Sequence, residues 1–111
     1  MIGDVDDAEG QQVANEIATK FGKENISYIH LDVSDPDQCQ ACVDKAVSEF
    51  GGVHCLLNSA IKMAPGMLKD LSLSDWNTMI KIGLTGTFLM TQAAGRWMID
   101  NKMPGSIVNM S

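Results

Sequence analysis

The sequence has very little arginine and no surplus of basic residues. Arg96 is the single arginine, lysine and arginine together number 8, and aspartate and glutamate number 14, which gives a net charge of −6. Binding to the phosphates of a nucleic acid requires clustered Lys or Arg side chains. We therefore expect no nucleic-acid partner, although the acidic surplus is too small to predict a disordered chain.

Long apolar runs and export signals are also missing. No apolar run approaches the roughly 18 residues that cross a membrane, and the first residues carry neither the basic nor the apolar segment of a secretion signal. Three cysteines, an odd number, indicate reduced thiols rather than a disulfide framework. These absences predict a protein with no membrane partner and a cytoplasmic location.

Two of the cysteines, Cys39 and Cys42, match the C-x-x-C pattern of redox pairs and zinc sites. Both fall on the apolar stripe of a predicted helix, and no second C-x-x-C or H-x₃-H pair completes a set of four zinc ligands. We therefore predict that both thiols pack in the core. Redox or zinc chemistry is the alternative.

What the sequence does contain is a regular alternation of strand and helix patterns across residues 1–111, a length that suits one domain. Short apolar or β-branched runs bounded by turn residues predict strands at 1–4, 26–33, 53–60 and 106–110. Strands that alternate with helices predict a parallel sheet with helices on both of its faces.

Three helices have clear start signals. Asp6 with Glu9 and Ser72 with Asp75 have the spacing of capping boxes, and Pro36 suits the first turn of a helix. The predicted helices end at Gly22, at Gly51 and near Asn101. The first helix carries one apolar stripe with helical spacing, and its members are Val13, Ile17 and Phe21.

The run Val53–Ala60 is predicted to be a strand that is buried on both faces of a parallel sheet. In a doubly wound sheet the carboxyl ends of the strands face the ligand crevice. Asn58, Ser59 and Ala60 are therefore predicted to lie at the site. The irregular stretch 59–71 that follows is of a length that is usually functional or mobile.

Several pieces of the chain, in this order, match the strand ends and the long helix of one family. Asp4 closes a strand before a helix, and 31–34 is similar to an "Asp-Val" end of a third strand. The stretch 56–60 is similar to an "Asn-Asn-Ala-Gly" strand end, and 105–111 resembles a strand that leads to a catalytic serine. With 76–88, which looks like the long helix, the whole chain resembles the short-chain dehydrogenase/reductase family.

The resemblance implies an α/β fold with a Rossmann-like doubly wound parallel sheet. It also implies that the sheet is incomplete, because the family's first strand with its Gly-rich loop and the C-terminal part are absent, which makes residues 1–111 a partial dinucleotide-binding domain. The implied reaction is hydride transfer between a nicotinamide cofactor and a small-molecule alcohol or carbonyl substrate.

The cofactor implied by the resemblance is NAD rather than NADP. Asp4 would accept hydrogen bonds from the adenosine ribose, and its carboxylate would repel a 2′-phosphate. The residues themselves support this choice, because no Lys or Arg precedes Lys20 to neutralise a phosphate.

The remaining cofactor residues implied by the resemblance lie at two later strand ends. Asp32 and Val33 would line the adenine pocket, through polar and apolar contacts respectively. Asn58, Ser59 and Ala60 would run beside the cofactor, where short side chains let the ribose approach the backbone.

The chain also departs from the family. It has no Gly-x-x-x-Gly-x-Gly loop to cradle the pyrophosphate and no Tyr-x-x-x-Lys pair, since the residue four after Tyr28 is Asp32. Gly83 stands where the family has an asparagine, and the family's catalytic serine falls one residue beyond Ser111, or on Ser111 if the register differs by one. No catalytic set is intact, so we expect the chain alone to be inactive.

The absence of a central strand has consequences for folding. The strands on either side of it must either pair directly or leave unpaired backbone groups, each of which costs about 1–3 kcal/mol when buried. Total stability is only about 5–15 kcal/mol, so we expect the isolated chain to be molten or to aggregate.

Two other functions are compatible with the sequence. In the family the long helix pairs with its twin, which implies a homo-oligomeric parent that associates through helix 72–101. The same helix allows a second hypothesis, a truncated, non-catalytic product or binding module that docks on a full-length homologue. A phospho-acceptor receiver domain is a third hypothesis, but the paired acids after a first strand and the lysine at the last strand are absent.

Overall fold

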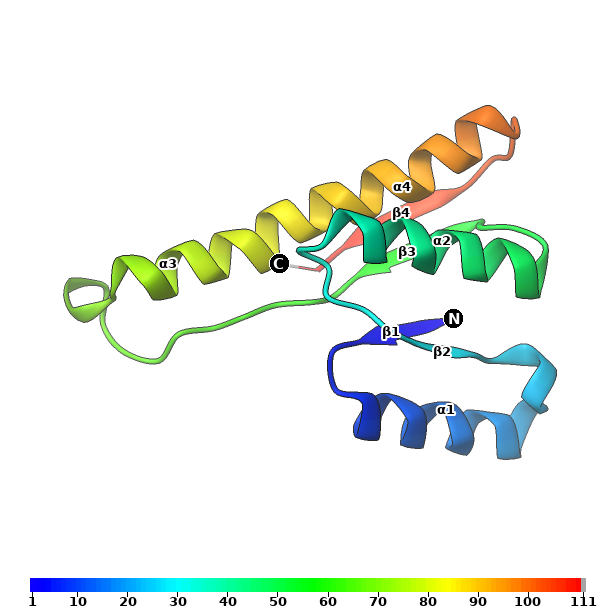
Figure 1. The fold of residues 1–111 in the computed structure, drawn as a ribbon, viewed down its shortest axis with the longest axis horizontal. Coiled ribbons are helices and arrows are strands. Elements are labelled where there is room, and N and C mark those ends of the chain that lie inside the picture. The colour runs from blue at the N-terminus through cyan, green and yellow to red at the C-terminus, as the bar shows by residue number, and fades with distance from the viewer. Residues whose placement is uncertain (111) are drawn as a thin grey trace.

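The strands form two separate parallel pairs in the computed structural model, which describes residues 1–110 (Figure 1). β1 (Ile2–Asp4) pairs with β2 (Tyr28–His30), and β3 (Cys55–Asn58) pairs with β4 (Ser106–Asn109). All four strands run from right to left in Figure 1, so their carboxyl ends point to the same side. The predicted order of strands and helices is confirmed. The strands on either side of the missing strand were predicted either to pair directly or to leave unpaired backbone groups. The structure shows the second outcome, because β1 and β3 do not pair.

β2 and β3 are shorter than predicted. β2 stops at His30 because the chain turns at Asp32, whose backbone oxygen accepts from the Asp35 N–H at 3.0 Å and whose side chain accepts from the Ser34 N–H at 2.9 Å. Asp32 and Val33 therefore lie in a turn and not in the strand. β3 similarly covers only the middle four residues of the predicted run.

The first two helices have the predicted bounds, and the first has the predicted cap. α1 (Asp7–Phe21) is capped by Asp6, which accepts from the backbone N–H of Glu9. α2 (Pro36–Phe50) is capped by Asp35 and ends at Gly51, whose φ of 80° is left-handed and suits glycine. Two 3₁₀ turns complete the connections, at Lys23–Asn25 and at Leu68–Asp70.

The long helix is one continuous rod built from three segments: α3 (Leu73–Met79), the π-helical η3 (Ile80–Gly86) and α4 (Thr87–Asp100). Ser72 caps it by accepting from the Asp75 N–H at 3.0 Å. Gly86 lies directly against Val33, since a Cβ there would come within 2.5 Å of the Val33 Cγ2 atom, whereas a Cβ at Gly83 would meet nothing within 4 Å. Close packing therefore explains Gly86 but not Gly83.

The core lies between α2, α4 and one face of the strands. Cys39, Val43 and Ala94 are among its most buried members, and Ile29 of β2 and Leu56 of β3 pack against them. Cys39 and Cys42 are both buried, which confirms the prediction that the two thiols pack in the core.

α1 covers the opposite face of the first strand pair. Its Gly10 contacts the ring of Tyr28 so closely that a side chain there would clash. The buried residues of α1 are Gly10 and Ala14, whereas Val13 and Phe21 are exposed. The apolar stripe of α1 is therefore only partly buried, because the helix packs mainly on β1, β2 and the 3₁₀ turn Lys23–Asn25 through the side that carries Gly10 and Ala14.

The second face of the β3–β4 pair has no helix over it within residues 1–110. Leu57 is 60% exposed and Val108 is 53% exposed. The prediction that the run Val53–Ala60 is buried on both faces is therefore wrong, because α2 and α4 cover only the face that carries Leu56.

The molecule is more open than a domain of this length usually is. Its radius of gyration is 15.4 Å, against about 13 Å expected for a compact domain of about 110 residues. The α3 end of the long helix projects beyond the strands in Figure 1. Within the described part of the chain, no helix combines the length and apolar character needed to cross a membrane.

The two glycines of the π-helical segment give a matched test of the packing. Gly83→Ala should stabilise the fold by about 0.5–1 kcal/mol, because alanine favours a helix and has room there. Gly86→Ala should lower the thermal midpoint, because its Cβ would collide with Val33. Thermal melting followed by far-UV circular dichroism measures both, and equal effects from the two substitutions would contradict the packing.

Candidate functional site: a polar rim beside an apolar slot

Polar side chains collect where the strands end. Asp4 closes β1, Asn58 closes β3 and Asn109 closes β4. Asp32 follows two residues after the end of β2. Because the strands point the same way (Figure 1), these residues lie at the carboxyl side of both strand pairs, and we call this set the polar rim.

Asp4 is exposed and fixed by local hydrogen bonds. Its Oδ1 atom accepts from the backbone N–H of Asp6 at 3.0 Å, which ties the carboxylate to the turn into α1. Its backbone oxygen accepts from the Leu31 N–H at 2.9 Å and from the Tyr28 hydroxyl at 2.8 Å. The carboxylate is thus held at the end of β1 and remains open to solvent.

A hydrogen-bonded cluster beside Asp4 was not anticipated from the sequence. The Tyr28 hydroxyl donates to Asp7 Oδ1 at 2.7 Å, and His30 Nδ1 lies 2.9 Å from the same oxygen. Loss of solvent contact, followed by the hydrogen bond to Asp7, raises the pKa of Tyr28 to about 12. Strand alternation, which puts residues 28 and 30 on one face, is the signal that could have placed both beside α1.

Asp32 and Val33 occupy one turn but have different surroundings. Hydrogen bonds from the hydroxyl and the backbone N–H of Ser34 hold the pKa of the Asp32 carboxyl below its usual range. Asp32 is therefore an ionised group at neutral pH. Val33 packs on Gly86 and on the core, and it also borders the slot described below.

Asn58 is the one buried polar residue of the rim, at 8% exposure. Its side-chain amide donates to Thr91 Oγ1 at 3.1 Å and to Asn109 Oδ1 at 2.8 Å, so it ties β3 to α4 and to β4. Asn109 was not singled out from the sequence, although its place at the end of a predicted strand could have indicated it. Ser59 and Ala60 follow Asn58 and are exposed.

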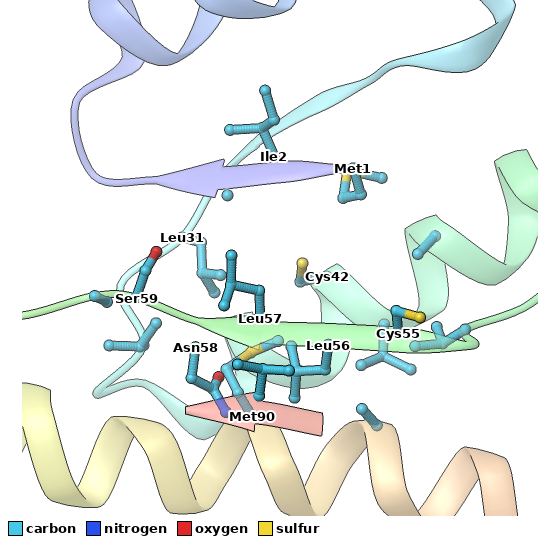
Figure 2. A pocket seen from close by; sticks show the side chains of 18 of the residues that line it. Met1, Ile2, Leu31, Cys42, Cys55, Leu56, Leu57, Asn58, Ser59 and Met90 are labelled. Atoms are coloured by element: carbon cyan, nitrogen blue, oxygen red, sulfur yellow. The ribbon is translucent and has the colours of Figure 1, made fainter. Parts of the chain in front are cut away.

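A cavity of about 600 Å³ lies between β1 and β3 (Figure 2). We call it the slot. Figure 2 shows Leu57 on the side of β3 that faces β1, with Met1, the residue before β1, across from it. Four of the six predicted cofactor residues border the slot, namely Val33, Asn58, Ser59 and Ala60, while Asp4 and Asp32 do not.

The remaining candidate residues from the sequence are the two core cysteines, Gly83 and Ser111. Burial raises the pKa of the Cys39 thiol to about 11 and also raises that of Cys42, so both thiols stay protonated. No group of three or more His, Cys, Asp or Glu side chains among residues 1–110 is placed to hold a metal. The Gly83 carbonyl accepts from the Thr87 hydroxyl at 2.7 Å. Ser111 lies outside the described residues.

Comparisons with known proteins place the chain among dehydrogenases. A family model described as Enoyl-(Acyl carrier protein) reductase matches residues 1–111. The 3-alpha-(or 20-beta)-hydroxysteroid dehydrogenase of Mycobacterium tuberculosis is 40% identical over 111 residues, which are 100% of this chain and 40% of that protein. The chain thus spans less than half the length of the curated relatives it matches.

Solved structures give the same result. A short chain dehydrogenase from Bacillus anthracis superposes with a TM-score of 0.89 at 30% identity, over 98% of this chain and 44% of that one. ElxO with NADP bound has a TM-score of 0.82 at 30% identity, over 99% of this chain and 44% of that one. The two strand pairs therefore correspond to an incomplete Rossmann sheet.

The single tyrosine gives a direct test of the cluster beside Asp4. Ultraviolet titration of tyrosinate should give a Tyr28 pKa of about 12. Asp7→Asn should bring this value down towards 10 because it removes the charged acceptor, while Asp70→Asn, far along the chain, should leave it unchanged. Because the pKa is raised on folding, the stabilisation is complete below pH 10 and is lost as the pH rises through about 12. A wild-type pKa near 10 would show that the cluster does not form.

Proposed function

The chain belongs to the short-chain dehydrogenase/reductase family, and we propose that it supplies the adenosine side and the middle of the dinucleotide site of an NAD-dependent oxidoreductase. The observation that carries this proposal is the exposed carboxylate of Asp4, fixed at the carboxyl end of β1. In open α/β sheets a carboxylate at such a strand end accepts hydrogen bonds from the adenosine ribose.

The charges around Asp4 support NAD over NADP. Asp4, Asp6 and Asp7 form an acidic group at the start of α1, and no Lys or Arg precedes Lys20. A 2′-phosphate on the ribose would add negative charge next to these carboxylates without a cation to offset it. ElxO, which has the same fold, has NADP bound, so the fold alone does not determine the cofactor. The proposal of NAD therefore rests on the side chains of this chain.

The other rim residues support the adenosine half of the site. Asp32 is ionised and offers acceptor oxygens beside the turn that carries Val33. Ser59 and Ala60 have short, exposed side chains at the end of β3, where a ribose can approach the backbone. Asn58 is saturated by Thr91 and Asn109 as a donor, so we assign it the role of holding β3 and β4 together at the rim rather than a direct cofactor contact.

The bound dinucleotide would supply the hydride acceptor or donor of the reaction. Tyr28, the single tyrosine, is not available as a proton donor for an alcohol or carbonyl at the rim, because its hydroxyl donates to Asp7 and its pKa is raised. Gly83 presents a backbone carbonyl that is already hydrogen-bonded to Thr87 and no side-chain amide. We therefore propose that residues 1–111 alone do not turn over. An NADH-linked assay with alcohols and ketones would measure this directly.

The substrate class that we propose for the whole protein is a small-molecule alcohol or the corresponding carbonyl compound. The support is the name of the Mycobacterium tuberculosis relative, a hydroxysteroid dehydrogenase. We also propose a cytoplasmic location, which the three free cysteines support because thiols persist in a reducing compartment.

A second function is supported by the long helix. Four large apolar side chains at four-residue spacing are exposed along its first half, namely Trp76, Ile80, Leu84 and Phe88. Such a stripe is typical of a helix that packs on another protein. We propose that it joins two copies in the parent protein, or docks this chain on a full-length homologue.

Nucleotide binding tests the first function. Adding 5′-AMP should shift the NMR amide signals of Asp4, Asp32 and Val33, and adding adenosine 2′,5′-bisphosphate should give at least tenfold weaker binding. Asp4→Ala should weaken 5′-AMP binding about tenfold, because the ribose loses its acceptor.

Asp70→Ala, in a distant 3₁₀ turn, is the matched control and should bind 5′-AMP as the wild type does. Equal affinity for the two nucleotides, or shifts confined to other parts of the chain, would refute the assignment of the rim to NAD.

Self-association tests the second function. Leu84→Glu puts a charge in the middle of the exposed stripe, where Leu84 is 65% exposed, and should shift the chain to a lower oligomeric state by analytical ultracentrifugation. Leu68→Glu is the control, because Leu68 is 82% exposed but lies outside the helix. If Leu84→Glu still co-purifies with an intact homologue as well as the wild type does, the stripe is not the contact.

A further inference from the structure

His30 lies directly beside Asp4 in the first strand pair. The Cα atoms of these two residues are register partners in the parallel pairing of β1 with β2. Gly3 and Ile29 form the register pair before them, and Ile29 packs against the core. Because successive side chains of a strand point to opposite faces, those of Asp4 and His30 share the other face, which α1 covers.

The imidazole ring of His30 is held by a carboxylate of α1. Its Nδ1 atom lies 2.9 Å from Asp7 Oδ1, the same oxygen that accepts from the Tyr28 hydroxyl at 2.7 Å. Hydrogen bonds from Tyr28 and from His30 hold the pKa of the Asp7 carboxyl below its usual range. The ring is therefore fixed next to an ionised carboxylate, while the His30 side chain stays 50% exposed to solvent.

The groups that surround His30 are mainly acidic. They are Asp4 of β1, Asp6 and Asp7 at the start of α1, Tyr28 on the same strand, and Asp32 in the turn that follows β2. Histidine is the side chain that ordinarily changes its charge between pH 5 and pH 8. The charge of this cluster therefore depends on the protonation of His30 in that range.

Lysine side chains do not provide the same dependence. Lys20 lies in the last turn of α1, at the opposite end of the helix from Asp7. Lys81 acts on the Asp32 carboxyl through space, but a lysine does not ordinarily titrate between pH 5 and pH 8. Any change of the local charge in this range is therefore assigned to His30.

We propose that His30 is a specificity-determining residue of the adenosine site, and that its protonation weakens the discrimination against a ribose 2′-phosphate. The proposal rests on the proposed function, because it takes Asp4 as the residue that binds the ribose. With a neutral imidazole, the carboxylates beside the ribose repel a 2′-phosphate. An imidazolium offsets one of these negative charges, so the repulsion is smaller at about pH 5.5 than at about pH 8.

Nucleotide binding at two pH values tests the proposal on residues 1–111. The dissociation constants of 5′-AMP and of adenosine 2′,5′-bisphosphate are measured by calorimetry at low salt, at about pH 8 and about pH 5.5. The readout is the ratio of the bisphosphate constant to the 5′-AMP constant. We expect this ratio to fall as the pH is lowered, and high salt should reduce the effect because His30 is half exposed.

His30→Gln separates the protein's contribution from that of the ligand. A 2′-phosphate itself takes up a proton with a pKa of about 6, and this uptake is common to the wild type and the variant. Glutamine keeps a hydrogen-bonding side chain beside Asp7 but cannot become a cation. The fall of the ratio should therefore be at least threefold smaller in His30→Gln than in the wild type.

The second histidine of the chain provides the matched control. His54 precedes β3 and so lies at the amino end of that strand, away from the polar rim. His54→Gln should keep the pH dependence of the wild type. It also assigns the two histidine ring signals in the NMR spectrum.

The ring signal of His30 gives a readout on the unsubstituted chain. Adding the bisphosphate at about pH 6.5 should move this signal towards its protonated position, and adding 5′-AMP should move it less. A ligand that binds the protonated site better must also favour protonation of that site. This measurement decides the matter even if His30→Gln does not fold.

Two results would overturn the proposal while leaving the adenosine site in place. One is an equal fall of the ratio in the wild type and in His30→Gln, and the other is an equal response of the His30 signal to the two nucleotides. Absence of 5′-AMP binding at both pH values would instead refute the proposed function, and this proposal with it.

Discussion

The two strand pairs are held together by helix packing and not by strand pairing. Leu31, which follows β2, and Leu56 of β3 both contact the core formed by α2 and α4, whereas no backbone hydrogen bond among residues 1–110 joins β1 to β3. Apolar packing is not directional, so it fixes the two halves side by side without closing the gap between them. The openness of the molecule, the exposure of Leu57 and the existence of the slot all follow from this.

The polar rim depends on the same packing. Asp4 and Asp32 belong to the first strand pair, and Asn58 and Asn109 belong to the second, so their relation is set by the helices that bridge the pairs. Within each pair the rim is well fixed. Asp4 is tied by Asp6 and Tyr28, and Asn58 is tied by Thr91 and Asn109. The rim can therefore present an adenosine site on one half while the slot between the halves remains open.

The long helix contributes both to the core and to the exposed surface of the molecule. Its α4 part supplies core residues such as Ala94, its Gly86 accepts Val33 in close contact, and its α3 part projects with apolar side chains exposed. The π-helical turns lie where these environments meet, and a widened helix at such a place frequently marks a functional position. The same rod thus anchors the strands at one end and offers a contact surface at the other.

Much of the local structure follows from residue types alone. Asp6, Asp35 and Ser72 begin their helices because a short polar side chain can accept from the free N–H groups of a first turn, and Gly51 ends one because it tolerates a left-handed φ. The positions of Asp4, Asp32 and Asn58 at strand ends followed from the same patterns. These features depend on neighbours within a few residues, so the sequence by itself determined them.

Tertiary structure decided everything that depends on which surfaces meet. A pattern of apolar residues does not tell whether a partner covers each of them. Leu57 was predicted to be buried and is exposed, and Val13 and Phe21 of the apolar stripe on α1 are exposed as well. The donor bonds of Asn58 and the Asp7–Tyr28–His30 cluster join residues more than 20 positions apart. Their contacts exist only because packing brings distant parts of the chain together.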